Sequence, residues 1–154
     1  MLACTPARSA DRLKDLQDRF DKETRASGKV KALDKLADAQ FDVATKAGEG
    51  GDFTTVGLTL EKYRDNVKTT FELLKKQEPD SEKHPTGYRH LELQVRRGIR
   101  EVEQTVMIAP NELRPPLEIV HQDLLDMDDA LIRLLFPKHS SVPEKVAELP
   151  EEKQ

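Results

Sequence analysis

The sequence predicts an all-α protein, a bundle of four or five helices. Apolar residues recur at spacings of three and four over residues 9–137, as on one face of an α-helix. Charged residues make up 35% of the chain and aromatic residues 5%. That balance suits amphipathic helices, because each needs one apolar stripe while its opposite face stays charged. The length of 154 residues corresponds to one domain of ordinary size.

The first helix is predicted over residues 9–25, with Ser9 as its N-cap, because a serine hydroxyl can accept a hydrogen bond from a first-turn amide. Its apolar face consists of Leu13, Leu16 and Phe20. Gly28, in the stretch ASGK, is predicted to break or bend the chain before a second helix over residues 29–47. The apolar face of that second helix consists of Val30, Leu33, Leu36, Ala37, Phe41 and Ala44.

Three glycines within GEGGDF, residues 48–53, predict the turn between the second and third helices. Gly50 or Gly51 can adopt the left-handed conformation that ends a helix, and Asp52 can cap the next one. A Walker-type phosphate loop would need a lysine, a following Ser or Thr and a preceding strand, and this stretch supplies neither the lysine nor the strand. A Gly-Gly-Asp-Glu-Phe cyclase signature would need a glutamate that is missing here. The glycines are therefore interpreted as a turn.

The third helix is predicted from Asp52 to about Glu78, which precedes Pro79. Its start, FTTVGLTL, contains β-branched residues that also suit a short strand, but the chain offers no partner strand. We therefore predict a helix there as well. Its apolar face consists of Val56, Leu60, Tyr63, Val67, Phe71 and Leu74.

Two proline-containing linkers, PDSEKHPTG and APNELRPP, delimit a fourth helix over residues 86–108 and a fifth that begins near Pro116 and ends before Pro137. Their apolar faces consist of Tyr88, Leu91, Val95, Ile99, Val102 and Val106, and of Leu117, Val120, Leu124, Met127, Leu131 and Leu134. The third to fifth helices, each roughly 30 to 40 Å long, are matched for side-by-side antiparallel packing.

The predicted organisation is a flexible N-terminus over residues 1–8, a helical bundle domain over 9–137 and a disordered tail over 138–154. The tail is predicted from its polar, proline-containing sequence without helical periodicity. The first two helices are expected to lie across the bundle or extend from it.

Residues 51–53, Gly-Asp-Phe, resemble the turn of a tetratricopeptide-like helical hairpin, in which such a sequence ends one helix and caps the next. Ala44 matches the small residue expected seven positions before the glycine, and Leu60 matches a bulky downstream position. Three positions depart from the pattern: Ala47, Val56 and Tyr63. The resemblance covers about 34 residues in one copy. It implies a helical hairpin and no specific ligand.

Three further stretches, RFDKET, KLADAQFD and LEKYRDNV, resemble segments of a group of bacterial all-helical proteins that have no assigned activity, several of which begin with an export signal. The resemblance favours a cell-envelope location. In addition, MLAC resembles the end of a lipoprotein processing site, where a small residue precedes a cysteine that becomes acylated. The apolar run that comes before such a site is missing here. Cys4 is therefore either a candidate lipid anchor or an ordinary residue of a flexible terminus.

Charge and composition argue against several classes of function. The formal net charge is −4, and acidic and basic residues are interleaved, so no basic surface for nucleic acid is predicted. The apolar runs are too short for a transmembrane span. A single cysteine excludes an intrachain disulfide and a multi-cysteine metal site.

Glu118 and His121 are the candidate metal ligands, because di-iron bundles use Glu-x-x-His pairs on two helices. A second pair is absent, and both residues lie at the edge of the apolar face of the fifth helix. We therefore interpret them as solvated boundary residues, and no cofactor is predicted.

The remaining polar clusters have structural interpretations. His84 and His90 flank a helix start containing proline, so their spacing fixes no geometry between them. Arg96, Arg97 and Arg100 form a basic patch on the fourth helix, whose functional interpretation is an anionic partner. We favour pairing within the helix at spacings of three and four, such as Arg97 with Glu101. The acidic cluster on the fifth helix, interpreted as a solvated face, consists of Asp123, Asp126, Asp128 and Asp129.

The sequence therefore favours a noncatalytic helical scaffold or protein–protein interaction module with an unidentified protein partner. The expected binding surface is a groove between the first two helices and the rest of the bundle. The alternatives are a metal-dependent helical-bundle enzyme and a homo-oligomeric structural protein.

Overall fold

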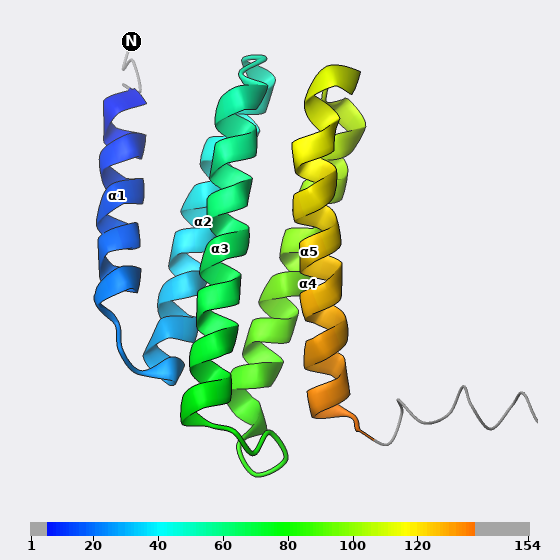
Figure 1. Cartoon of the computed structure of the whole chain (residues 1–154). Helices are drawn as coiled ribbons and strands as arrows, with labels where there is room; N and C mark the ends of the chain where they lie inside the picture. Colours follow the sequence, from blue (N-terminus) through cyan, green and yellow to red (C-terminus); the bar gives the residue numbers. More distant parts are fainter. Residues whose placement is uncertain (1–5, 138–154) are drawn as a thin grey trace, which may run out of the picture.

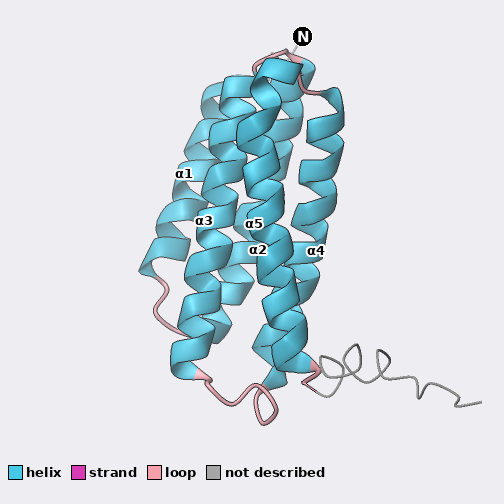
Figure 2. Cartoon of the chain, turned by 45° about the vertical axis from the view of Figure 1, so that its right-hand side comes forward, coloured by secondary structure: helices cyan, strands magenta, loops and turns pink. Residues whose placement is uncertain are grey.

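A computed structural model describes residues 6–137, which form five α-helices and one short 3₁₀-helix, with no strand in that range (Figures 1 and 2). The elements are α1 (Pro6–Lys22), α2 (Ala26–Glu49), α3 (Phe53–Gln77), α4 (Pro85–Ile108), η1 (Asn111–Leu113) and α5 (Arg114–Leu135). The all-α prediction is confirmed, including a helix over FTTVGLTL. The predicted tail and most of the predicted flexible N-terminus lie outside the described residues. No helix in the described range is long and apolar enough to cross a membrane.

Helices α2, α3, α5 and α4 follow one another around a four-helix bundle, and each contacts its two neighbours (Figure 1). The pairs α2–α3 and α4–α5 are antiparallel, whereas α3 and α5, and likewise α2 and α4, run parallel to each other. Helix α1 packs against α2 on the outside of this bundle. The expectation that the first two helices lie across the bundle or extend from it is therefore wrong, because α2 is one of the four central helices. Its continuous apolar face is the physical reason, since that face must be buried against other helices.

The core contains the apolar faces that the spacing predicts. Every predicted face residue of α2 and α3 is buried, as are most of those of α4 and α5. The exceptions are partly buried and pack against the core: Leu13, Leu16, Val106, Met127 and Leu134. At α1, Phe20 alone of its predicted face is fully buried, at 1% exposure. The core thus belongs to the four central helices, and α1 covers one edge of it.

The turn between α2 and α3 is the one predicted from the glycine cluster. Gly51 has a φ of 76°, the left-handed conformation that glycine adopts without a steric penalty. Asp52 caps α3, because its carboxylate accepts hydrogen bonds from the Thr55 hydroxyl at 2.6 Å and the Thr55 amide at 3.1 Å. These two bonds lower the pKa of Asp52. With 24 and 25 residues, α2 and α3 extend well beyond the 34-residue hairpin of the tetratricopeptide-like resemblance.

The predicted starts of the first two helices are both wrong. Helix α1 already includes residues 6–8, so Ser9 lies inside it and is not its N-cap. The chain breaks at residues 23–25, and Gly28 lies inside the first turn of α2. The Glu23 carboxylate lies against Gly28, and a side chain at position 28 would collide with it. Gly28 therefore leaves room for a neighbouring side chain and does not break the helix.

Buried Lys29 attaches α1 to α2. Its Nζ donates hydrogen bonds to the carbonyl oxygens of Phe20 at 2.9 Å and Glu23 at 3.2 Å, at the end of α1. The same atom lies 4.3 Å from the centroid of the Phe20 ring. A cation at this position neutralises free carbonyls at a helix C-terminus.

Helices α3 and α4 approach closely where Tyr63 lies on Gly98. A Cβ atom at position 98 would overlap the Tyr63 ring, so only glycine allows this contact without a shift. The Tyr63 hydroxyl hydrogen-bonds to Gln94, at 3.0 Å from its carbonyl oxygen and 3.1 Å from Oε1. Burial raises the pKa of Tyr63. The contact joins the α2–α3 hairpin to α4.

Candidate functional site

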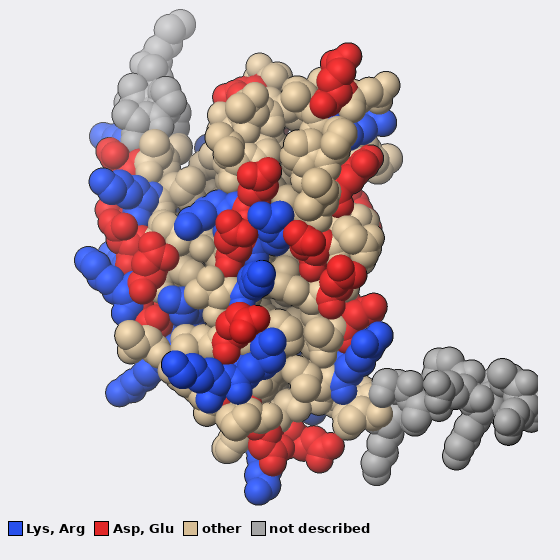
Figure 3. Space-filling model, viewed as in Figure 1, with Lys and Arg blue, Asp and Glu red and all other residues tan. Residues whose placement is uncertain are grey.

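Most large exposed hydrophobic side chains of the described residues lie at one end of the bundle. This end is formed by the last turn of α4, by η1 and by the first two turns of α3 and of α5. We call it the apolar end and define it by Leu58, Met107, Ile108, Leu113 and Ile119. Their exposed fractions range from 40% for Leu113 to 77% for Met107. Figure 3 shows few charged groups on the viewed face over the starts of α3 and α5, whereas charged groups crowd the rest of that face.

The backbone of the apolar end is fixed by Arg114. Its Nε donates to the Ala109 carbonyl oxygen at 2.9 Å, and one Nη donates to the Met107 carbonyl oxygen at 3.3 Å. Ala109 is 2% exposed, so the residue after α4 is anchored in the core. Met107 and Ile108 are therefore exposed on an ordered helix end and not on a free loop.

The charged side chains around the apolar end are mainly acidic. Those exposed there are Glu49, Asp52, Glu112 and Glu118. Two basic groups close to this end are engaged, because Arg114 bonds to the α4 carbonyls and Lys46 pairs with Asp42 at 3.0 Å. The apolar end therefore combines uncovered hydrophobic side chains with a negative rim.

The two candidate metal ligands do not converge on a common site. Glu118 is exposed, and His121 Nε2 lies 3.0 Å from Glu103 Oε1 on α4. Over residues 6–137, no group of three or more His, Cys, Asp or Glu side chains is placed to hold a metal ion. His121 thus takes part in an α4–α5 contact. Cys4, the candidate lipidation site, lies outside the described residues.

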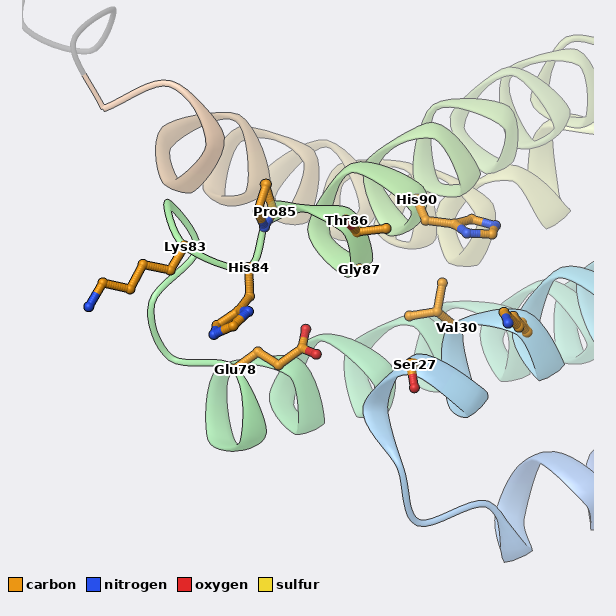
Figure 4. Close-up of a pocket in the computed structure, with 10 residues that line it drawn as sticks. Ser27, Val30, Glu78, Lys83, His84, Pro85, Thr86, Gly87 and His90 are labelled. Carbon is orange, nitrogen blue, oxygen red and sulfur yellow. The ribbon is translucent and has the colours of Figure 1, made fainter.

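His84 and His90 line the same pocket of about 220 Å³ between the starts of α2 and α4, a proximity that their sequence spacing did not predict (Figure 4). His90 Nε2 bonds to the Asp34 carboxylate of α2. The Glu78 carboxylate lies beside the first turn of α4, near Gly87, where a free anion would otherwise be attracted. His90 therefore takes part in a contact between α2 and α4.

The predicted pairing of Arg97 with Glu101 is wrong. Arg97 forms its ion pair with Asp38 of α2, and its guanidinium lies 5.1 Å from the centroid of the Phe41 ring. Packing of α4 against α2 brings that carboxylate and ring within reach of Arg97. The interhelical contact therefore replaces the local one.

The predicted groove between the first two helices and the bundle is filled at one point and open at two others. Phe20 and Lys29 fill the junction of α1 and α2. Two open hollows of about 290 and 590 Å³ remain at the margins of α1. Charged and polar residues predominate in number among their linings, but most of the surface that these linings expose is apolar.

The structure also contains a carboxyl pair between α4 and α5 that the sequence did not predict. Glu92 is 6% exposed, and Asp128 Oδ1 is buried and accepts no hydrogen bond. Arg96 Nε lies 2.6 Å from Glu92 Oε1. Burial, and then the neighbouring Glu92 carboxyl, raise the pKa of Asp128 to about 6. Over residues 6–137 no third side chain joins the pair to form a metal site.

No protein-family model matches this chain, and neither a curated protein nor a solved structure is significantly similar to it.

Proposed function

We propose that this chain is a noncatalytic helical module that binds a protein partner at its apolar end. The observation that carries the proposal is the gathering of Leu58, Met107, Ile108, Leu113 and Ile119 at that end. A partner that buries these side chains would gain roughly 25 cal/mol for each Å² of apolar surface removed from water. Exposed hydrophobic groups that gather within a polar rim are typical of protein interaction sites.

The rigidity of this end supports the proposal. Arg114 ties the connection between α4 and α5 to two carbonyl oxygens, so Met107 and Ile108 are presented with little further ordering. A preorganised surface binds more tightly than a flexible one, because less conformational entropy is lost on binding.

The test is crosslinking and pull-down from the native host with a Met107→Ser, Ile108→Ser double variant. We expect the amount of captured partner to fall by about tenfold or more, since central apolar contacts dominate binding energy. The measurement is quantitative mass spectrometry of crosslinked partners, compared with the unaltered chain.

Leu93→Ser is the matched control, because Leu93 lies on the same helix and is 63% exposed, close to the 67% of Ile108, but lies away from the apolar end. Both variants should fold normally, as they alter exposed side chains. Equal capture by the double variant and the unaltered chain, or no specific partner in a broad screen, would refute the proposed function.

A further inference from the structure

The charge around the apolar end limits which partners can bind there. Glu49, Asp52, Glu112 and Glu118 are exposed at that end, and the Arg114 guanidinium is directed to the carbonyl groups of α4. Any partner that covers the hydrophobic side chains therefore brings its own rim close to four carboxylates. Acidic groups of the partner would be repelled by these carboxylates, and basic groups would be attracted. Such charge complementarity governs the specificity of binding and the rate at which two proteins associate.

We infer that the partner segment is an amphipathic helix whose apolar face is flanked by lysine and arginine. The inference depends on the proposed function, because it assigns the chemistry of the partner at the same surface. Hydrophobic side chains of the partner cover Met107, Ile108 and Ile119, and its cationic groups lie opposite Glu112 and Glu118. An amphipathic helix offers both in one element, with the two kinds of residue on adjacent faces.

The same charges disfavour three other occupants. A second copy of this chain docking end to end would place two sets of carboxylates against each other. The phosphate groups of a nucleic acid or of an anionic lipid surface would be repelled for the same reason. A basic protein segment is the occupant that satisfies both the apolar residues and the rim.

Two synthetic amphipathic peptides of about 18 residues test the inference, with leucine at identical i, i+3, i+4 and i+7 positions. One carries lysine at its polar positions and the other carries glutamate. Binding to the full chain is measured by fluorescence anisotropy at low and high salt. We expect the lysine peptide to bind about tenfold or more tightly than the glutamate peptide, with an affinity that falls as salt screens the charges.

Charge reversal locates the binding surface. Glu112→Lys with Glu118→Lys should weaken binding of the lysine peptide by about tenfold. Asp21→Lys with Glu82→Lys is the control, because it makes the same change in net charge with exposed residues at the opposite end of the bundle. That control should leave the affinity within about twofold, since charges more than a Debye length away are largely screened.

Equal binding of the two peptides, or equal weakening by the two double variants, overturns the inference and leaves the apolar end as a candidate surface for an uncharged partner. Failure of both peptides to bind also overturns it. The proposed function is decided separately, by the loss of native partner capture in the Met107→Ser, Ile108→Ser variant. The two hypotheses can therefore fail independently.

Discussion

Asp128 combines a buried carboxylate oxygen with a second carboxyl group as its neighbour. Burial disfavours its charged form, and Glu92 across the α4–α5 interface adds repulsion. Arg96 compensates Glu92 from the surface, at 2.6 Å between Nε and Oε1. The resulting pKa of about 6 for Asp128 lies above its usual value of 3.8. Between these two pH values the folded chain binds more protons than the unfolded chain, so this group makes the fold less stable as pH rises.

We therefore expect Asp128→Asn to increase the free energy of unfolding at pH 7.5, by on the order of 1 kcal/mol after solvent screening. The difference from the unaltered chain should disappear near pH 4, where Asp128 is protonated in the folded state. Urea denaturation at a series of pH values measures both effects. Asp126→Asn is the control, because Asp126 is exposed and bonds to Gln122 on its own helix. A stabilisation independent of pH would contradict the assigned cause.

At the scale of the helix, Lys29 decides how α1 is attached. The α1 helix has one fully buried apolar residue, Phe20, and the Lys29 ammonium bonds to carbonyl groups at the same helix end. Reciprocal amide hydrogen bonds between Gln17 and Asn66, at 3.1 and 3.0 Å, add a polar link to α3. The attachment of α1 therefore depends on a few specific contacts as much as on apolar packing.

Lys29→Met should destabilise the protein by about 1–3 kcal/mol, because it removes two charge-assisted hydrogen bonds and leaves the carbonyl groups of Phe20 and Glu23 without this donor. Lys31→Met makes the same chemical change at an exposed position two residues away and should cost less than about 0.5 kcal/mol. Chemical denaturation followed by circular dichroism compares the two variants. Similar midpoints for both would show that Lys29 does not hold α1.

The helices themselves could be predicted from sequence because their signals are local. The spacing of apolar residues predicted the buried face of each central helix. Gly51 and Asp52 predicted the α2–α3 turn, because the backbone conformation and the capping bonds there involve residues within four positions of each other. The error at Gly28 has a different origin. Its role depends on the carboxylate of Glu23, in the connection between α1 and α2. A glycine that breaks a helix and a glycine that makes room for a neighbouring side chain look the same in a sequence.

The site was much less predictable, because its contacts are long-range. Arg97 has an acidic residue four positions away in Glu101, yet it pairs with Asp38 on another helix. Glu92 and Asp128 are separated by 36 positions along the chain and meet only through α4–α5 packing. Met107 and Ile108 did carry a signal, as two large apolar residues that follow the last stripe residue of the fourth helix and precede a proline-containing linker. Periodicity alone could not show that nothing covers them.

At the scale of the whole molecule, the four central helices and α1 differ in how much of their surface is buried. Helices α2 to α5 each contact two neighbours around the bundle, whereas α1 packs mainly along α2 (Figure 1). Elements with fewer buried contacts open at a lower free energy than the rest of a domain.

Native-state hydrogen exchange followed by mass spectrometry should therefore show α1 amides exchanging about tenfold or more faster than those around Leu33 and Leu36, at the centre of α2. Within α1, protection should be greatest near Phe20, where the helix is attached to α2. Exchange of α1 and α2 at a common rate would show that the five helices unfold as one unit.

The contact between Tyr63 and Gly98 also determines the axial alignment of the α2–α3 hairpin relative to the α4–α5 hairpin. The linker that joins α3 to α4 does not by itself fix their axial alignment, since apolar stripes repeat at every turn and a shift of one turn would still place apolar residues face to face. The Tyr63 ring fits at position 98 because glycine has no side chain there. If α4 were shifted by one turn, the ring would meet the side chain of Gln94 or Val102. A single missing methyl group thus selects one alignment among several that the hydrophobic pattern allows.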